Sequence, residues 1–280
     1  MPLQTDRRDD VLRLVRHRPL VMGVLNVTPD SFYDGNRYAS FDSAVARAQA
    51  MIEEGADIID IGAESTRPGA DAVPEEIEAQ RAWPVVEAVA QLGAAVSIDT
   101  RKSSVAQGAV ERGACIINDV SAMTFDENMG AVAADSGAIA VLMHAQGDPK
   151  TMQQNPVYGN VVREICEFLS ARALVAQSVG IPPDHIWIDP GIGFGKNLEH
   201  NLQILDNIGD FCQLGYPVLI GASRKSFIGK LTDGLPPEER LEGSLAAAAI
   251  AVYQGASIIR THDPRATKRA IAIAAAIRSA

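Results

Sequence analysis

Short apolar runs alternate along the chain with longer segments in which apolar residues recur every three or four positions. The short runs predict strands and the longer periodicity predicts amphipathic helices. The clearest example is the stretch 186–196, where an apolar run stops at Asp189 and a proline and three glycines follow. Proline and glycine allow a sharp turn and a close approach of the backbone to a ligand. This stretch therefore predicts a strand and a tight loop, with a helix after them.

The same order of strand, loop and helix recurs eight times. The predicted strands are residues 19–27, 57–62, 95–99, 115–119, 138–144, 186–189, 217–222 and 257–261. The predicted helices are residues 42–55, 74–92, 103–112, 126–135, 160 to near 180, 198–214, 241–254 and 264–279. Strands that alternate with helices in this way indicate a parallel sheet built from βα units.

Two parallel-sheet folds agree with such a pattern. An open, doubly wound sheet usually has five or six strands and a Gly-x-Gly-x-x-Gly turn after the first. Here the first strand ends in Asn26-Val-Thr-Pro-Asp instead. Eight units in 280 residues favour a single-domain (β/α)8 TIM barrel over residues 19–280. Residues 1–18 are predicted to be an amphipathic N-terminal extension that covers one end of the barrel.

Composition narrows the class of protein. The net charge of −10 argues against nucleic acid or an anionic membrane as a partner. The beginning of the chain lacks the apolar core of a signal peptide, and no apolar run is long enough to span a bilayer. Three widely spaced cysteines are typical of reduced thiols. We therefore expect a soluble, cytoplasmic protein that acts on small molecules.

In a TIM barrel the functional site lies at the carboxyl ends of the strands. That rule selects ten polar residues: Asn26, Thr66, Arg67, Asp99, Asn118, His144, Asp189, Lys225, Arg260 and His262. Two carboxylates and an amide, from Asp99, Asn118 and Asp189, suit a planar heterocycle that presents N–H and amino donors, such as a pterin or purine. Each of the three could instead be a turn former or a helix cap.

A second group is cationic. Arg67, Lys225, Arg260 and His262 lie at the same predicted face of an acidic protein, which favours an anionic substrate or leaving group such as diphosphate. Solvated surface charges are the alternative, and it is weaker for Lys225 and Arg260 because both closely follow apolar strands.

Three further strand-end residues have separate interpretations. Ser226 opens a helix, and free N–H groups at a helix start bind carboxylates or phosphates. Asn26 has a hard oxygen that suits Mg2+ together with diphosphate and water, although an ordinary turn asparagine explains it equally well. His144 could be a ligand or a base, but because it ends an apolar strand it is interpreted as a hydrogen-bonded structural histidine.

Seven motifs at these strand ends carry a family resemblance. They are Asn-Val-Thr-Pro-Asp-Ser-Phe (26–32), Glu-Ser-Thr-Arg-Pro-Gly (64–69), Ser-Ile-Asp-Thr (97–100), Asn-Asp-Val (118–120), Asp-Pro-Gly-Ile-Gly-Phe-Gly-Lys (189–196), Ser-Arg-Lys-Ser (223–226) and Arg-Thr-His-Asp (260–263). In this order they resemble the dihydropteroate synthase family from about residue 19 to residue 280. The resemblance implies a homodimeric TIM-barrel transferase of folate biosynthesis. Such enzymes condense 6-hydroxymethyl-7,8-dihydropterin diphosphate with 4-aminobenzoate, giving 7,8-dihydropteroate and pyrophosphate.

The resemblance also implies roles for individual residues. The pterin would be held by Asp99, Asn118, Asp189 and Lys225, and the diphosphate by Asn26 with Mg2+ and by Arg67, Arg260 and His262. Thr66 and Ser226 would lie near the aminobenzoate, with Phe32 and Pro68 in the closing loops. Catalysis would depend on Asp99, Lys225, Arg260 and His262. Tyr33 and Asn36 depart from the small residue and second glycine common in the family, which implies at most altered sensitivity to sulfonamides.

Three other functions remain open at this point. A pterin-dependent methyltransferase barrel shares the Asp/Asn/Asp set but has no need of the cationic group. A Schiff-base aldolase would use Lys225 as its nucleophile. A catalytically silent paralogue would bind a pterin, or a partner protein, without turnover.

Overall fold

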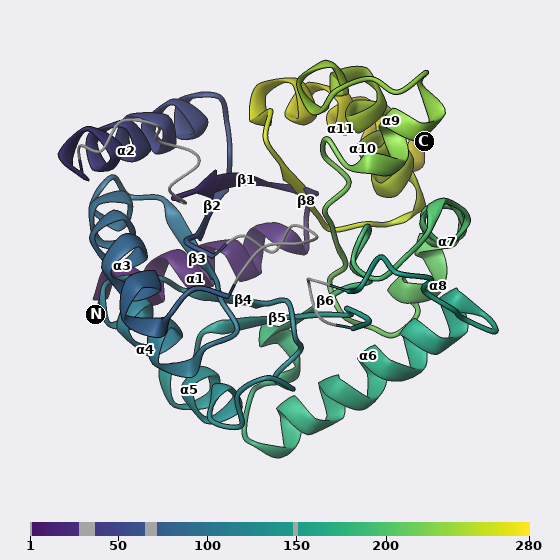
Figure 1. Cartoon of the computed structure of the whole chain (residues 1–280). Helices are drawn as coiled ribbons and strands as arrows, with labels where there is room; N and C mark the ends of the chain where they lie inside the picture. The colour runs from purple at the N-terminus through teal and green to yellow at the C-terminus, as the bar shows by residue number, and fades with distance from the viewer. Residues whose placement is uncertain (1, 28–36, 65–71, 148–150) are drawn as a thin grey trace.

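The computed structural model describes residues 2–27, 37–64, 72–147 and 151–280, and Figure 1 labels its elements. Eight parallel strands form one sheet in the order β6-β5-β4-β3-β2-β1-β8-β7. The two outer strands of that order meet through a bridge between Ile188 and Val218, where the Ile188 amide donates to the Pro217 carbonyl at 3.0 Å. The sheet is therefore closed into a barrel, and the predicted (β/α)8 fold is confirmed.

The elements match the predicted ranges with few differences. The strands are β1 (Leu20–Asn26), β2 (Ile58–Gly62), β3 (Ala95–Asp99), β4 (Ile116–Asp119), β5 (Ile139–Met143), β6 (Ile186–Asp189), β7 (Leu219–Ile220) and β8 (Ile258–Thr261). The helices are α1 (Pro2–Val15), α2 (Arg37–Glu53), α3 (Glu75–Gln91), α4 (Ser103–Glu111), α5 (Met129–Ser136), α6 (Val161–Ser178), α7 (Leu198–Asp206), α8 (Ile208–Cys212), α9 (Ser226–Leu231), α10 (Leu241–Gln254) and α11 (Pro264–Arg278).

One predicted helix, residues 198–214, is in fact two. Asn207 has φ −124° and ψ 34°, outside the helical region, and separates α7 from α8. The first amide of α8, from Ile208, donates a hydrogen bond to the side-chain oxygen of Gln254 at 3.1 Å. A tertiary partner on α10 thus satisfies a donor that a continuous helix would have satisfied internally.

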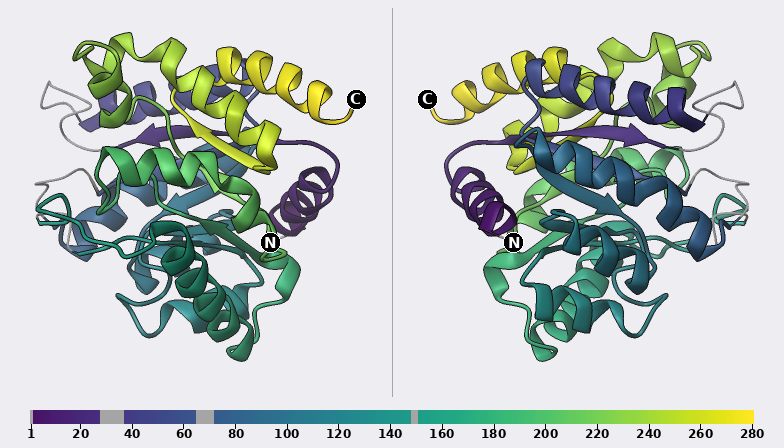
Figure 2. Two further views of the ribbon diagram at one scale, coloured as in Figure 1. Left: turned by 90° about the vertical axis from the view of Figure 1, so that its right-hand side faces the viewer. Right: turned by 90° about the vertical axis from the view of Figure 1, so that its left-hand side faces the viewer.

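Alternate side chains of each strand point into the barrel, as the pleat requires. One hydrophobic cluster, which includes Leu20, Ile58, Ile139 and Trp187, fills part of the barrel interior. Val11 and Leu12 of α1 are buried in the same cluster. Figure 2 shows α1 at the end of the barrel from which the strand arrows point away. Helix α1 therefore closes the amino-terminal end of the barrel. The polar side chains lie at the opposite end.

The outward faces of the strands pack against the surrounding helices. One aliphatic cluster joins α2–α5 to the first strands, and another joins α6–α11 to the last ones. Within the described part of the chain, no helix combines the length and apolarity needed to cross a membrane.

Candidate active site at the carboxyl ends of the strands

The polar trio predicted from the strand ends lies at one mouth of the barrel. Asp99 and Asn118 are register partners on β3 and β4, and Asp189 is the last residue of β6. All three side chains are buried. A buried carboxylate or amide needs a hydrogen-bonding partner from the protein or from a ligand.

Arg260 connects this trio to a residue that the sequence did not single out. Its Nε donates to the Oδ2 of Asp60 at 2.6 Å, and its Nη2 donates to the Oδ2 of Asp99 at 2.8 Å. Asn118 donates to the same Asp60 oxygen at 3.2 Å. Arg260 is thus a cation shared by two carboxylates, and Asp60 orients both Arg260 and Asn118.

Asp60 was missed because it lies in the middle of β2, not at its end. The signal that could have found it is an acidic residue at an inward position of an otherwise isoleucine-rich strand. Its side chain has no exposed surface. A carboxylate placed there is stable only with a charged or hydrogen-bonding partner, so its presence implied one.

The charges of the site follow from burial and from these partners. Burial raises the pKa of Asp99 to about 7, and Arg260 opposes that shift. Burial also raises the pKa of Asp189 to about 6, opposed by the Gly191 amide that donates to its Oδ1 at 2.7 Å. Burial alone would lower the pKa of Arg260, but Asp60 and Asp99 raise it. Arg260 is therefore a permanent cation between acceptors.

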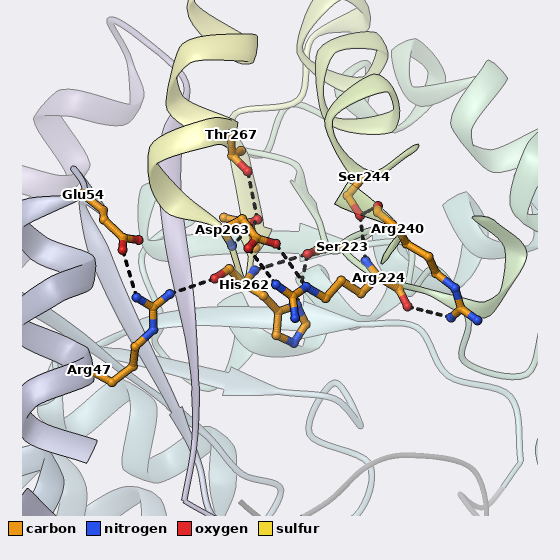
Figure 3. A network of polar contacts seen from close by, with 10 residues as sticks. Arg47, Glu54, Ser223, Arg224, Arg240, Ser244, His262, Asp263 and Thr267 are labelled. Carbon is orange, nitrogen blue, oxygen red and sulfur yellow. Dashed lines mark hydrogen bonds and ion pairs between the residues drawn. The ribbon is translucent and has the colours of Figure 1, made fainter. Parts of the chain in front are cut away.

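His262 lies on the β8 side of the mouth, where Figure 3 shows it next to Ser223. The Ser223 hydroxyl accepts from the His262 amide at 3.2 Å and lies 3.0 Å from its Nδ1. Burial, together with the neighbouring Arg260 and Arg224, lowers the pKa of His262 to about 4. The ring is therefore neutral, and in the tautomer in which the Ser223 hydroxyl donates to Nδ1 the ring carries its proton on Nε2. That N–H is a donor suited to an anionic group.

Arg224 fixes the loop that carries Lys225. It has a left-handed backbone (φ 58°), which is unfavourable for a residue with a side chain. Its guanidinium pairs with Asp263 in a two-pronged contact at 2.7 and 3.1 Å, and its amide donates to Ser244 at 2.9 Å. Arg240 donates to its carbonyl at 3.0 Å (Figure 3). These contacts stabilise the strained conformation.

Lys225 and Phe194 come from the neighbouring loops that follow β7 and β6. The Lys225 ammonium lies 4.1 Å from the centroid of the Phe194 ring, a cation–π contact. Ser226, the next residue, is exposed at the start of the six-residue helix α9. Asn26 is half-buried at the end of β1, where its register partner is Gly62.

The remaining predicted residues divide into two groups. His144 is buried and its Nδ1 accepts a hydrogen bond from Lys196 at 3.0 Å, in keeping with a structural histidine. The residues Phe32, Tyr33, Asn36, Thr66, Arg67 and Pro68 lie outside the described residues.

The sequence is similar to those of known proteins. Residues 22–262 match the family model described as pterin binding enzyme. The fold and the site therefore define a pterin-binding (β/α)8 enzyme. The chain is 47% identical to a dihydropteroate synthase of Escherichia coli over 263 residues, which are 94% of this chain and 93% of that protein. It is 47% identical to the Haemophilus influenzae synthase over 250 residues, 89% of this chain and 90% of that one.

Solved structures give the same result. The Yersinia pestis dihydropteroate synthase with a sulfonamide drug complex superposes with a TM-score of 0.88 at 45% identity, covering 94% of this chain and 95% of that chain. The Xanthomonas albilineans synthase in complex with 7,8-dihydropteroate has a TM-score of 0.85 at 42% identity, covering 94% and 95%. The chain belongs to the dihydropteroate synthase family, as the seven motifs predicted.

Proposed function

We propose that this protein condenses 6-hydroxymethyl-7,8-dihydropterin diphosphate with 4-aminobenzoate to give 7,8-dihydropteroate and pyrophosphate. The observation that carries the proposal is the polar mouth of the barrel in a chain of this family: Arg260 pairs with Asp99 and Asp60, Asn118 donates to Asp60, and Asp189 is buried at the end of β6. The carboxylates and the amide would accept from and donate to the edge of the pterin ring.

The reaction breaks one bond and forms another. The bond between the pterin methylene carbon and the diphosphate oxygen breaks, and its electron pair leaves with the diphosphate. The aminobenzoate nitrogen forms the new C–N bond and loses one proton to solvent. Positive charge develops on the pterin as the diphosphate departs, and the Asp99 carboxylate stabilises it. The Nε2–H of His262 is a donor for the leaving oxygens, and the Lys225 ammonium is a donor to the bound pterin.

We propose that Mg2+ accompanies the diphosphate. Among the described residues, no three His, Cys, Asp or Glu side chains gather into a metal site. Mg2+ commonly takes few protein ligands beside substrate phosphates and water. The amide oxygen of Asn26, at the end of β1, fits the place of a single protein ligand. The ion would supply neutralisation of the diphosphate charge.

The experiment is product formation by the purified protein, with 7,8-dihydropteroate measured by mass and pyrophosphate by release. We expect product only when both substrates are present, and we expect EDTA to abolish it until Mg2+ is restored. Pterin binding without product would support the silent paralogue or the methyltransferase. Trapping of a carbonyl substrate on Lys225 by borohydride would support the aldolase. Full activity in EDTA would refute the Mg2+ proposal alone.

Pterin binding should depend on pH through the two buried carboxyls. Because their pKa values are raised to about 7 for Asp99 and about 6 for Asp189, both gain protons as the pH falls. A protonated carboxyl loses its charge and an acceptor, so the affinity for 6-hydroxymethylpterin should fall from about pH 7.5 to about pH 4.5. Fluorescence titration measures it. An Asp189→Asn variant should lose the component near pH 6, and a flat wild-type profile would contradict the assignment.

We also propose a homodimer, in which two copies join through α10 and α11. These helices lie side by side on the outside of the barrel (Figure 1). Ile250 and Tyr253 on α10, and Ile273 and Ile277 on α11, each expose more than half of their surface. Their spacings of three and four residues place each pair on one helical face. An apolar face of this kind is typical of an obligate partner.

Light scattering after gel filtration tests the dimer. We expect a dimer for the wild type and a monomer for Ile273→Glu, because a charge at an apolar contact must lose its hydration. Leu174 on α6 is the matched control, being 63% exposed against 64% for Ile273. A monomeric wild type would contradict the proposal, and so would a Leu174→Glu variant that dissociates while Ile273→Glu does not.

A further inference from the structure

The loop between β6 and α7, residues 190–197, is held in place by a buried lysine, Lys196. Lys196 is 2% exposed. Its ammonium donates to the Nδ1 of His144 at 3.0 Å, to the His144 carbonyl at 3.2 Å and to the Phe194 carbonyl at 2.9 Å. An ammonium has three N–H donors, and here each has an acceptor. Lys196 therefore connects the end of β5 to the β6–α7 loop.

The acceptors of Lys196 are neutral groups. Burial lowers the pKa of His144 to about 3, so its ring is uncharged and its Nδ1 is free to accept. Burial also lowers the pKa of Lys196 to about 7, and the carboxylate of Asp189 opposes this shift. A buried cation without a directly bonded carboxylate costs more than an apolar side chain of similar size. Stability alone therefore does not account for a lysine at this position.

The two segments that Lys196 joins meet backbone to backbone. Gly191 has a left-handed backbone (φ 71°), and an added Cβ would overlap the carbonyl oxygen of His144. The same Cβ would lie 3.4 Å from the Lys196 ammonium. Gly191, which makes this close contact with His144, also donates its amide hydrogen to Asp189. Gly191 and Lys196 together therefore set the position of the β6–α7 loop relative to β5.

The loop in turn supports Lys225. The Phe194 carbonyl accepts from Lys196, and the Phe194 ring lies 4.1 Å from the Lys225 ammonium. A Cβ on Gly193 would come within 3.2 Å of the Lys225 side chain. A small displacement of this loop would therefore move the ring and change where the Lys225 ammonium lies.

Neutral contacts also hold this loop and provide comparisons. The Tyr158 hydroxyl donates to the Gly195 carbonyl at 2.9 Å, and the Gly193 amide donates to Asn201 at 2.8 Å. Removing one such neutral hydrogen bond typically costs about 1 kcal/mol. If Lys196 had only a structural role, the effect of replacing it would therefore resemble the effect of Tyr158→Phe.

We propose that Lys196 is a positioning residue of the pterin site, whose ammonium fixes the β6–α7 loop so that Phe194 supports Lys225. The proposal rests on the proposed function, because it assigns Lys225 to the bound pterin.

The test is a double-variant cycle with 6-hydroxymethylpterin as the probe. We expect Lys196→Met to weaken its binding about 10- to 100-fold, the range for one misplaced charged donor. Tyr158→Phe and the exposed-lysine control Lys230→Met should change it by less than about threefold. In a Phe194→Leu background, the same Lys196→Met change should cost less than about threefold, because its effect passes through that ring.

The outcomes separate this proposal from the proposed function. A wild type without dihydropteroate formation would refute the function. If the wild type is active but Lys196→Met binds the probe normally, the positioning role is overturned. It is also overturned if Lys196→Met weakens probe binding as much in the Phe194→Leu background as in the wild type. Thermal denaturation establishes that each variant is folded. If the methionine variant does not fold, Lys196→Gln, which keeps N–H donors but loses the charge, replaces it in the same binding measurements.

Discussion

Arg260→Ala is expected to lower dihydropteroate formation about 100- to 1,000-fold and to lower the melting temperature as well. Removal of a preorganised charged donor costs about 100- to 1,000-fold in rate. Arg260 also pairs with two buried carboxylates, Asp60 at 2.6 Å and Asp99 at 2.8 Å. Its loss leaves both without a cation, and breaking a buried pair from one side costs about 3–5 kcal/mol.

Two variants test whether the unpaired carboxylates cause this loss of stability. Asp60→Asn added to Arg260→Ala removes one of the unpaired charges, so the double variant should melt at a higher temperature than Arg260→Ala alone. Arg265→Ala on α11 is the control, because Arg265 is exposed at the surface. An Arg260→Ala protein that melts like the wild type would contradict the shared-cation account. A double variant less stable than the single one would do the same.

Asp99→Ala is expected to lower kcat about 100-fold, because the carboxylate stabilises the positive charge that develops on the pterin. The Asp99→Asn variant separates the effect of the carboxylate charge from that of the side-chain shape. It retains an oxygen that can accept from Arg260, which now donates to Asp99 Oδ2 at 2.8 Å. If charge matters, the asparagine variant should lose nearly as much kcat as the alanine variant, with the KM for 4-aminobenzoate little changed. A kcat close to the wild type for Asp99→Asn would contradict the role.

The fold was predictable because each βα unit leaves a local signal. The strand 186–189 was predicted at its observed boundaries, since an apolar run ended at a polar residue before proline and glycine. The split of the following helix at Asn207 was not predictable. It depends on a contact from Gln254, 46 residues away along the chain. Long-range partners of this kind leave no periodic trace in the sequence.

The site was predictable only in part, for a similar reason. Asp99, Asn118, Asp189 and Arg260 were found from their places at strand ends, and barrel closure brings Arg260 to Asp99 across 161 positions of sequence. Asp60 was missed because its role depends on which face of β2 points inward. The pairing of Lys196 with His144 joins two loops, whose relative position follows from the closed sheet and not from either segment alone.

The most direct test of this account is a crystal structure of the protein with bound pterin diphosphate. We expect the pterin ring within hydrogen-bonding distance of Asp99, Asn118, Asp189 and Lys225, with the diphosphate directed toward the Nε2 of His262. A pterin bound away from these strand ends, or turned so that its diphosphate faces Asn118, would contradict the account.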